Sequence, residues 1–302
     1  MVSGPDKVYN TLPGERWFPK ESDFEDDMPL YWGDWGVASE VDELKAVLMR
    51  RPGKEIENFN SNEVRYRENV NVELFRKQHD DLAQIYKDYR VKVYYVEEQR
   101  VDRPNAVYVR DLMFMTPEGA IITRPGMAAR RGEERYIAQT LAKIGVPIVR
   151  TINGDGIFEG ANAMWVDRNT VILATSSRTN RSGYEQVEYE LKRMGVQNIV
   201  HMQIPYSNIH IDGLLNFASS DVVMIHAQQV PYDVCDVFRR KGIKILEAPS
   251  TKEVVETLGC NFVALKPGLV IHNGIEVISL EMSEFLKGRG AVHCSTAFLK
   301  RA

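Results

Sequence analysis

One cysteine of this sequence has neighbours that suit a nucleophile. Cys294 ends the segment Arg289-Gly-Ala-Val-His-Cys, so an arginine, a histidine and a thiol stand close together in the chain. The thiolate is the reactive form of cysteine, and nearby positive charge lowers the pKa of a thiol. The alternative is that Cys294 is a small buried hydrophobic residue. We adopt that interpretation for Cys235 and Cys260, which have no such neighbours.

Three other segments hold side chains that could assist a nucleophile. His210 and Asp212 are two residues apart, and an extended backbone would point both side chains to the same side. The pair could act as a general acid/base with its carboxylate, or His210 could be satisfied by an ordinary loop hydrogen bond. Glu159 follows a turn-rich stretch, and Asp111 lies within an apolar run predicted to be a strand. Because burying an unpaired carboxylate is costly, we expect Asp111 to meet either an internal arginine or a cationic substrate.

A cysteine, a histidine and three carboxylates at one place would suit chemistry on a guanidinium group. Two carboxylates can hold a flat cation through paired hydrogen bonds. A thiolate can then attack the central carbon, while a histidine protonates the amine that departs. This hypothesis requires that distant segments of the chain converge.

The order of the predicted elements gives a reason for such convergence. Three segments repeat the order strand, strand, helix, strand. They comprise strands 107–115, 120–123 and 147–150 with helix 132–144, strands 163–166, 170–174 and 198–202 with helix 184–194, and strands 214–217, 221–225 and 243–246 with helix 231–240. Strands 45–49 and 92–96 with helix 72–89 indicate a first unit, and strands 261–265, 269–271 and 275–280 indicate a fifth unit without a helix. Five units predict an α/β fold with pseudo-fivefold symmetry, and an open α/β sheet is the alternative.

Length, composition and charge limit the class of protein. The chain has 302 residues, 44% of them hydrophobic, and a formal net charge of −4 from 38 basic and 42 acidic side chains. We predict a single catalytic domain over residues 1–302, with residues 1–30 as a surface arm. The absence of a basic cluster argues against nucleic acid as a partner, and no apolar run is long enough to cross a membrane. Three widely separated cysteines predict a cytoplasmic protein without disulfides or a zinc site.

The motifs resemble those of the guanidino-group-modifying superfamily (the pentein fold), and most closely those of the arginine deiminases. In chain order the resembling segments are Asn105-x-x-Tyr108-x-Arg110-Asp111, Arg130, Glu159-Gly160, Arg178 in Ser-Arg-Thr-Asn, His210-x-Asp212 and Arg289-Gly-Ala-Val-His-Cys294. The resemblance implies a five-bladed α/β propeller of ββαβ units with one site on its axis, and it implies no metal and no organic cofactor. The amidinotransferases share the histidine and cysteine motifs, but they pass the amidino group to an amine instead of water.

The resemblance also implies a role for each residue. Asp111 and Asp212 would hold the guanidinium nitrogens, and Glu159 would support the histidine. Cys294 would form a covalent amidino-thioether, with His210 acting as the acid and then as the base for water. Substrate binding would fall to Asn105, Tyr108, Arg130, Arg178 and Arg289.

The three arginines of that set would bind an α-carboxylate, so the implied substrate is free L-arginine and the implied products are L-citrulline and ammonia. Transfer of the amidino group from arginine to an amine acceptor is the alternative reaction. A non-catalytic propeller that binds arginine is an alternative of another class. Members of this fold often form dimers, so a homo-oligomer is a further expectation.

Overall fold

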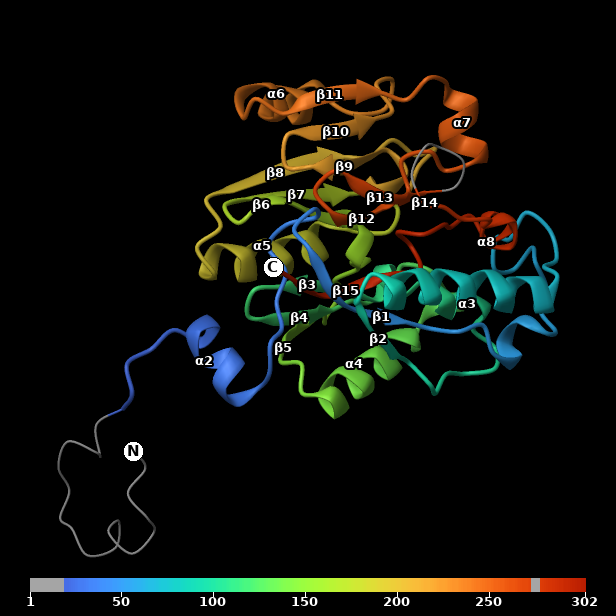
Figure 1. Ribbon diagram of the computed structural model, residues 1–302, viewed down its shortest axis with the longest axis horizontal. Helices are drawn as coiled ribbons and strands as arrows, with labels where there is room; N and C mark the ends of the chain where they lie inside the picture. The colour runs from blue at the N-terminus through green and yellow to red at the C-terminus, as the bar shows by residue number, and fades with distance from the viewer. Residues whose placement is uncertain (1–18, 273–277) are drawn as a thin grey trace, which may run out of the picture.

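The computed structural model of the chain describes residues 19–272 and 278–302, and its strands form five three-stranded sheets (Figure 1). In every sheet the middle strand pairs antiparallel with one neighbour and parallel with the other. The five sheets are β15 (Ala297–Arg301), β1 (Leu44–Met49) and β2 (Lys92–Tyr95); β3 (Met113–Thr116), β4 (Gly119–Ile122) and β5 (Ile148–Thr151); β6 (Ala163–Asp167), β7 (Thr170–Thr175) and β8 (Asn198–Gln203); β9 (Leu215–Ser219), β10 (Val222–Ile225) and β11 (Lys244–Glu247); and β12 (Val263–Lys266), β13 (Leu269–His272) and β14 (Ile278–Ser279). The prediction of a five-bladed α/β propeller is confirmed.

Helices connect the parallel strands within four of the blades. They are α3 (Val72–Asp88), α4 (Glu133–Ile144), α5 (Arg181–Arg193) and α6 (Tyr232–Arg240), each within a few residues of its predicted range. Figure 1 shows α3, α4 and α6 at the outside of the strands. In α3 the buried side chains include Phe75, Leu82 and Tyr86, whose spacing places them on one face of the helix. Further helices include α2 (Phe24–Tyr31), α7 (Thr251–Glu256), α8 (Ser283–Lys287) and the 3₁₀ helices η2 (Lys54–Ile56) and η5 (Ala128–Arg130).

Strands from the two ends of the chain join in one blade. The antiparallel neighbour of β1 is the C-terminal β15, with Val47 opposite Phe298 and Leu48 opposite Ala297. Figure 1 shows these two strands side by side. The first unit showed no strand ahead of β1 in the sequence because that strand comes from the other end of the chain. This pairing places the Cys294 segment, which precedes β15, among the turns that lead into the other blades.

The prediction of a single strand over 107–115 is wrong. Two 3₁₀ helices, η3 (Pro104–Val107) and η4 (Val109–Leu112), occupy the first part of this range, and β3 begins only at Met113. Every residue from 104 to 116 is buried, so no alternation of buried and exposed side chains separates a strand from other structure here. Asp111 therefore lies in a 3₁₀ turn that leads into a blade.

Short 3₁₀ helices precede the first strand of three consecutive blades. These are η4, η6 (Gly160–Asn162) and η7 (Ile211–Gly213), and η6 contacts both of the others. The expected extended backbone over His210 and Asp212 holds only for His210, with φ −133° and ψ 155°, because Asp212 already lies in η7. The contact between these turns brings their side chains together.

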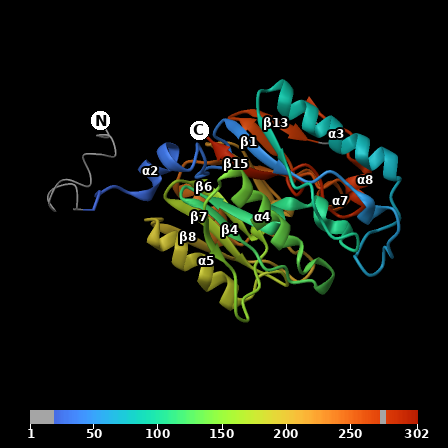
Figure 2. The same cartoon turned by 90° about the horizontal axis from the view of Figure 1, so that it is seen from below.

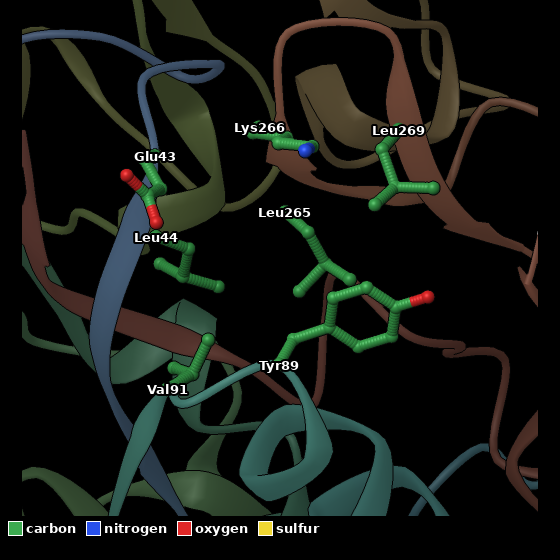
Figure 3. Close-up of a pocket in the computed structure, with 7 residues that line it drawn as sticks. All are labelled: Glu43, Leu44, Tyr89, Val91, Leu265, Lys266 and Leu269. Atoms are coloured by element: carbon green, nitrogen blue, oxygen red, sulfur yellow. The ribbon is translucent and has the colours of Figure 1, made fainter.

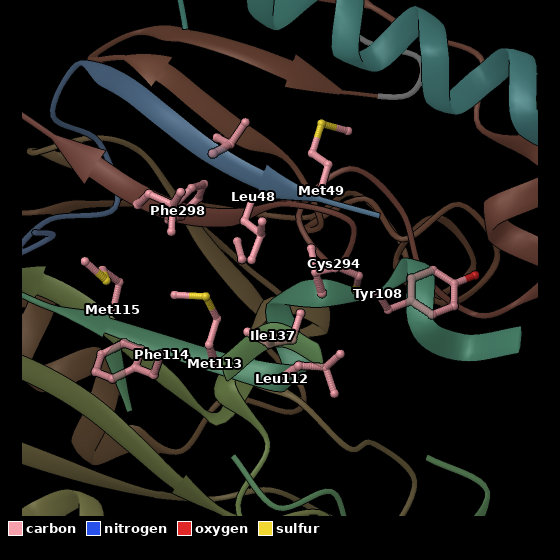
Figure 4. Close-up of a cluster of buried hydrophobic side chains, with 14 of the residues drawn as sticks. Leu48, Met49, Tyr108, Leu112, Met113, Phe114, Met115, Ile137, Cys294 and Phe298 are labelled. Atoms are coloured by element: carbon pink, nitrogen blue, oxygen red, sulfur yellow. The ribbon is translucent and has the colours of Figure 1, made fainter. Parts of the chain in front are cut away.

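Apolar side chains fill the space between the blades. Phe114 of β3 and Trp165 of β6 stack with ring centroids 5.7 Å apart. Figure 4 shows part of this cluster, in which Cys294 lies beside Tyr108. Removal of this apolar surface from water drives the blades together. Side chains of the same cluster, rather than solvent, surround the thiol of Cys294.

A small cavity lies where the first blade meets the fifth (Figure 3). Leu44 of β1, Leu265 of β12 and Val91 line it, with Tyr89 from the end of α3 at its side. None of its lining residues is a predicted site residue. The cavity is a gap in the packing between two blades.

The predicted surface arm falls partly on residues 1–18, which lie outside the described residues. Within the described part of the arm, α2 lies beside the blades (Figure 2) and is largely exposed, with Met28 buried. The predicted strand 275–280 likewise overlaps residues 273–277, which are not described. None of the helices in residues 19–272 and 278–302 combines the length and the apolar character needed to cross a membrane. The single domain, the cytoplasmic location, the lack of a nucleic-acid partner and the homo-oligomer stay predictions.

Candidate active site

Five buried side chains that the sequence singled out lie together: Cys294, His210, Asp111, Asp212 and Glu159. His210 Nε2 is 2.7 Å from Glu159 Oε2, and its Nδ1 is 3.5 Å from Asp111 Oδ1. The Sγ atom of Cys294 is 3.4 Å from Asp212 Oδ2. Both aspartates lie close enough to His210 and to Cys294 to shift the pKa of each. The structure thus brings the predicted nucleophile, acid/base and carboxylates into one cluster.

His210 has the electrostatic surroundings of a proton donor. Burial by itself lowers the pKa of its imidazole, but the charges of Asp111 and Glu159 and the hydrogen bond to Glu159 raise that pKa to about 9. The hydrogen bond and charge of His210 in turn lower the pKa of Glu159 against the effect of burial. The imidazole is therefore protonated at neutral pH and holds a proton that a leaving group can take.

Cys294 is a neutral thiol in the same surroundings. Burial and then the charges of Asp212 and Asp111 raise its pKa well above the ordinary value. The sequence argument that adjacent positive charge lowers this pKa is not supported by the geometry. Arg289 is exposed and donates from Nε to the carbonyl of Arg65 at 3.0 Å, and the ring of His293 faces Asp212. Neither Arg289 nor His293 therefore supplies the positive charge that the sequence argument placed beside the thiol.

Arg130 is the internal cation that Asp111 meets. Its Nη1 pairs with Asp111 Oδ2, and its Nε is 2.9 Å from Glu133 Oε2. Its Nη2 donates to the carbonyls of Asn105 and Tyr108 at 3.2 and 3.1 Å. Each guanidinium nitrogen of Arg130 thus bonds to the protein itself, and the side chain is buried. Its place is beside the acidic cluster, where it holds Asp111 in position.

Two of the three arginines expected to bind a carboxylate lie near the cluster, since the charges of Arg130 and Arg178 both lower the pKa of Glu159. Arg178 lies at the edge of the cluster, with Nε 3.8 Å from Glu159 Oε2 and 18% of its side chain exposed. Arg130 is engaged as described, and Arg289 stands at the surface with a positive φ of 65°. Arg178 is therefore the member of this set with both proximity to the cluster and exposure to a ligand.

Asn105 and Tyr108, also expected to bind substrate, support the walls of the site. Asn105 Nδ2 donates to the carbonyl of Val64 at 3.2 Å, and the Tyr108 hydroxyl donates to the carbonyl of Phe285 at 2.8 Å. A Cβ atom at Gly288 or Gly290 would collide with the Tyr108 ring. Glycine at both positions lets that ring pack against the segment that leads to Cys294.

Sequence reasoning missed a buried chain of polar groups behind Asp212. His293 Nδ1 is 2.9 Å from Asp212 Oδ2, and its Nε2 is 3.4 Å from Glu40 Oε2. Glu40 Oε1 accepts from Arg110 Nη2 at 2.9 Å. His293 and Arg110 stood within the motifs, whereas Glu40 carried no signal of its own. These groups fix the carboxylate that faces the thiol. Asn261, which contacts Cys294 directly, was also missed.

Glu40→Gln is expected to destabilise the fold by roughly 3–5 kcal/mol at pH 7, because it leaves the buried charge of Arg110 without its partner. Burial raises the pKa of Glu40, but Arg110 and His293 lower it to about 2. This stabilisation is present above the ordinary pKa of 4.5 and is lost as pH falls toward 2. The difference in unfolding free energy between wild type and variant, measured with urea, should therefore shrink at low pH. Glu43→Gln, at an exposed ion pair with Lys45, is the control and should change little.

Asp111, Glu159 and His210 could also act as metal ligands, since one ligand atom from each lies within 4.8 Å of the others. A metal ion would have to replace the hydrogen bond between His210 and Glu159 and compete with Arg130 for Asp111.

The fold and the cluster define a class of protein: the chain is a guanidino-group-modifying enzyme of the pentein superfamily. It belongs to the family described as N,N dimethylarginine dimethylhydrolase, eukaryotic, whose model matches residues 47–268. The match ends before the Cys294 segment. The chain is thus a hydrolase that acts on guanidino groups.

Curated proteins resemble the chain in sequence, and solved structures share its fold. The chain is 26% identical over 207 residues to N(G),N(G)-dimethylarginine dimethylaminohydrolase of Pseudomonas aeruginosa, which covers 63% of this chain and 75% of that protein. It is 22% identical to the arginine deiminase of Bacillus cytotoxicus, over 85% of this chain and 96% of that protein. A mutant of the Pseudomonas aeruginosa enzyme complexed with citrulline superposes with a TM-score of 0.70 at 22% identity, covering 85% of this chain and 99% of the other. The N-terminal domain of ArgZ, a cyanobacterial arginine dihydrolase, gives a TM-score of 0.73 at 18% identity, covering 86% and 98%.

Proposed function

We propose that the chain hydrolyses free L-arginine to L-citrulline and ammonia. The observation that carries this proposal is the pair of buried carboxylates, Asp111 and Asp212, beside the thiol of Cys294. Oδ1 of Asp111 has no hydrogen-bond partner within the described part of the chain. An unmethylated guanidinium has N–H groups on all three nitrogens, so it can donate to both carboxylates at once. Arg178, at the edge of the cluster, supports recognition of an α-carboxylate.

Binding of such a cation would also activate the nucleophile. The charges of Asp212 and Asp111 disfavour the thiolate of Cys294 in the free protein. A guanidinium between the carboxylates neutralises this charge and places a positive centre next to the sulfur. The pKa of the thiol therefore falls when the substrate is bound, and its proton passes to solvent.

The reaction then proceeds in two stages. Sγ of Cys294 attacks the central carbon and forms a C–S bond, and the C–N bond to a terminal nitrogen breaks as His210 gives that nitrogen its proton. Ammonia leaves, and an amidino-thioether remains on Cys294. His210, now neutral, takes a proton from water, and the hydroxide adds to the same carbon. The C–S bond breaks, the sulfur departs as thiolate, and the hydroxyl proton passes to solvent as the citrulline carbonyl forms.

A second candidate substrate is N,N-dimethylarginine. The family match and the relative in Pseudomonas aeruginosa favour it. The same covalent steps would release dimethylamine in place of ammonia. A dimethylated nitrogen has no N–H group, so one of the two carboxylates would lose part of its hydrogen bonding. The geometry therefore favours the unmethylated guanidinium.

Product analysis from L-arginine, N,N-dimethylarginine and agmatine tests these proposals. We expect citrulline and ammonia from L-arginine without an added amine, and slower turnover of agmatine because it has no carboxylate for Arg178. Citrulline and dimethylamine from dimethylarginine, with no product from arginine, would favour the second candidate. Ornithine that forms only when an amine acceptor such as glycine is present would instead show an amidinotransferase. No product from any of these substrates would contradict all three.

A further inference from the structure

We propose that Asn261 is a further catalytic residue, whose side-chain amide N–H stabilises the Cys294 thiolate. This inference rests on the proposed function only in taking Cys294 as the nucleophile. Asn261 lies in the turn between α7 and β12, two residues before the fifth blade's first strand. It is buried, and its backbone N–H donates to the carbonyl of Leu258 at 2.7 Å. The turn therefore holds the side chain in one place.

Hydrogen bonds fix which end of the Asn261 amide faces the sulfur. Oδ1 accepts from the backbone N–H groups of His293 and Cys294 at 3.0 and 3.3 Å. An amide nitrogen cannot accept those bonds, so the oxygen must take that side. Nδ2 is then directed at Cys294 Sγ, 3.1 Å away, and it is also 3.5 Å from the carbonyl of Asp212. The one side chain thus holds the backbone of the nucleophile and donates to its reacting atom.

The two ionisable side chains with the largest effects on the sulfur are both acidic. Burial, and then the charges of Asp212 from η7 and Asp111 from η4, raise the pKa of the thiol, while hydrogen bonds from the backbone at Ala291 and from the side chain of Asn261 lower it. The Tyr108 hydroxyl is neutral because its pKa lies well above the ordinary value. A donor at Asn261 is therefore the side-chain contact that favours the negative sulfur before substrate arrives.

A neutral donor suits both stages of the reaction better than a charged one. The sulfur is negative when it attacks the guanidinium carbon and negative again when it leaves the hydrated adduct, so one N–H group stabilises both events. A lysine or arginine here would pair with Asp212 and compete with the cationic substrate for the carboxylate. An amide assists the sulfur and leaves the acidic groups to the substrate.

Asn261→Asp tests this role with little change in shape. The variant retains an oxygen for the backbone N–H groups of His293 and Cys294, but it presents a second oxygen to the sulfur. The readout is the rate of Cys294 alkylation by iodoacetamide as a function of pH, with the labelled peptide identified by mass spectrometry. We expect the pKa of Cys294 to rise by about one unit and the rate below that pKa to fall about tenfold. Alkylation needs no turnover, so an error in the assigned substrate would not alter this result.

Two further variants separate the catalytic role from a structural one. Asn261→Ala removes the donor without adding charge, and a smaller fall in the same direction is expected if the aspartate variant does not fold. Asn216→Asp is the matched control, because Asn216 is also buried and donates from Nδ2 to the carbonyl of Phe262 at 2.7 Å. Alkylation of Cys294 in this control should stay within about twofold of wild type. A folded Asn261→Asp or Asn261→Ala variant with the wild-type pH dependence of alkylation would overturn the proposal.

Discussion

Cys294→Ala is expected to lower the rate of guanidine hydrolysis at least about 10⁴-fold, because it removes the sulfur that we propose as the nucleophile. Neither remaining thiol can replace it. Cys260 is buried and its pKa is raised to about 12, first by burial and then by the charge of Glu253. Cys235 lies on α6, on the outside of the fourth blade. The carboxylates proposed to hold the guanidinium are unchanged, so substrate affinity should change only a few-fold.

Steady-state formation of citrulline and calorimetric titration with the substrate measure the two quantities separately. Cys235→Ala is the matched control, since it removes a thiol without touching the cluster, and its turnover should stay within about twofold of wild type. A Cys294→Ala variant with more than about 1% of wild-type turnover would show that the sulfur is not the nucleophile. Loss of both turnover and binding in a folded variant would place the substrate elsewhere.

The architecture was largely predictable because each blade repeats the same local signals. The helices showed apolar residues at helical spacing, and the strands were short runs of branched residues between turns. The stretch from Pro104 to Leu112 could not be assigned in this way, because its side chains are buried on every side and no period remains. The pairing of β1 with β15 could not be predicted either, because a local sequence pattern does not indicate which distant strand will pair with it.

The candidate site was predictable to the extent that its residues stand in motifs. The structure brings Cys294, His210 and the three acids together, but adjacency in sequence misled the argument about charge, because Arg289 turns outward. Asn261 could have been found from the repeat itself. It precedes β12 by two residues, as Asp111 precedes β3 by two residues. Position within a repeat thus carries functional information that residue type alone does not.

Glu159→Gln is expected to lower turnover about 30-fold at pH 8 by removing the charge that keeps His210 protonated. In the wild type, burial lowers the pKa of His210, and the effects of Asp111 and Glu159 raise it to about 9. Without the charge of Glu159 this pKa falls toward the ordinary value of 6.5. The imidazole of the variant is then mostly neutral at pH 8 and has no proton for the departing nitrogen. Histidine resonances followed by NMR across this pH range would report the change in pKa directly.

The loss of turnover in Glu159→Gln should depend on pH if the role of Glu159 is electrostatic, but not if its role is structural. At pH 6 the variant regains much of the charge on His210, so its turnover should lie closer to that of wild type than at pH 8. A deficit that is equal at both pH values would contradict the argument, because a merely misplaced imidazole would be misplaced at either pH. Glu185→Gln, at an exposed ion pair with Arg181, is a control that should match wild type throughout.

The raised pKa of His210 also predicts how the stability of the fold depends on pH. The pKa of His210 is raised on folding from 6.5 to about 9, so the protonated imidazole stabilises the folded state fully below about pH 6.5. This contribution, on the order of 3 kcal/mol, is lost as pH rises from 6.5 through 9. The unfolding free energy of wild type should therefore fall over this interval, and that of Glu159→Gln should fall less. Equal slopes for the two proteins would show that Glu159 does not hold the charge of His210, and the assignment of His210 as the proton donor would lose its electrostatic basis.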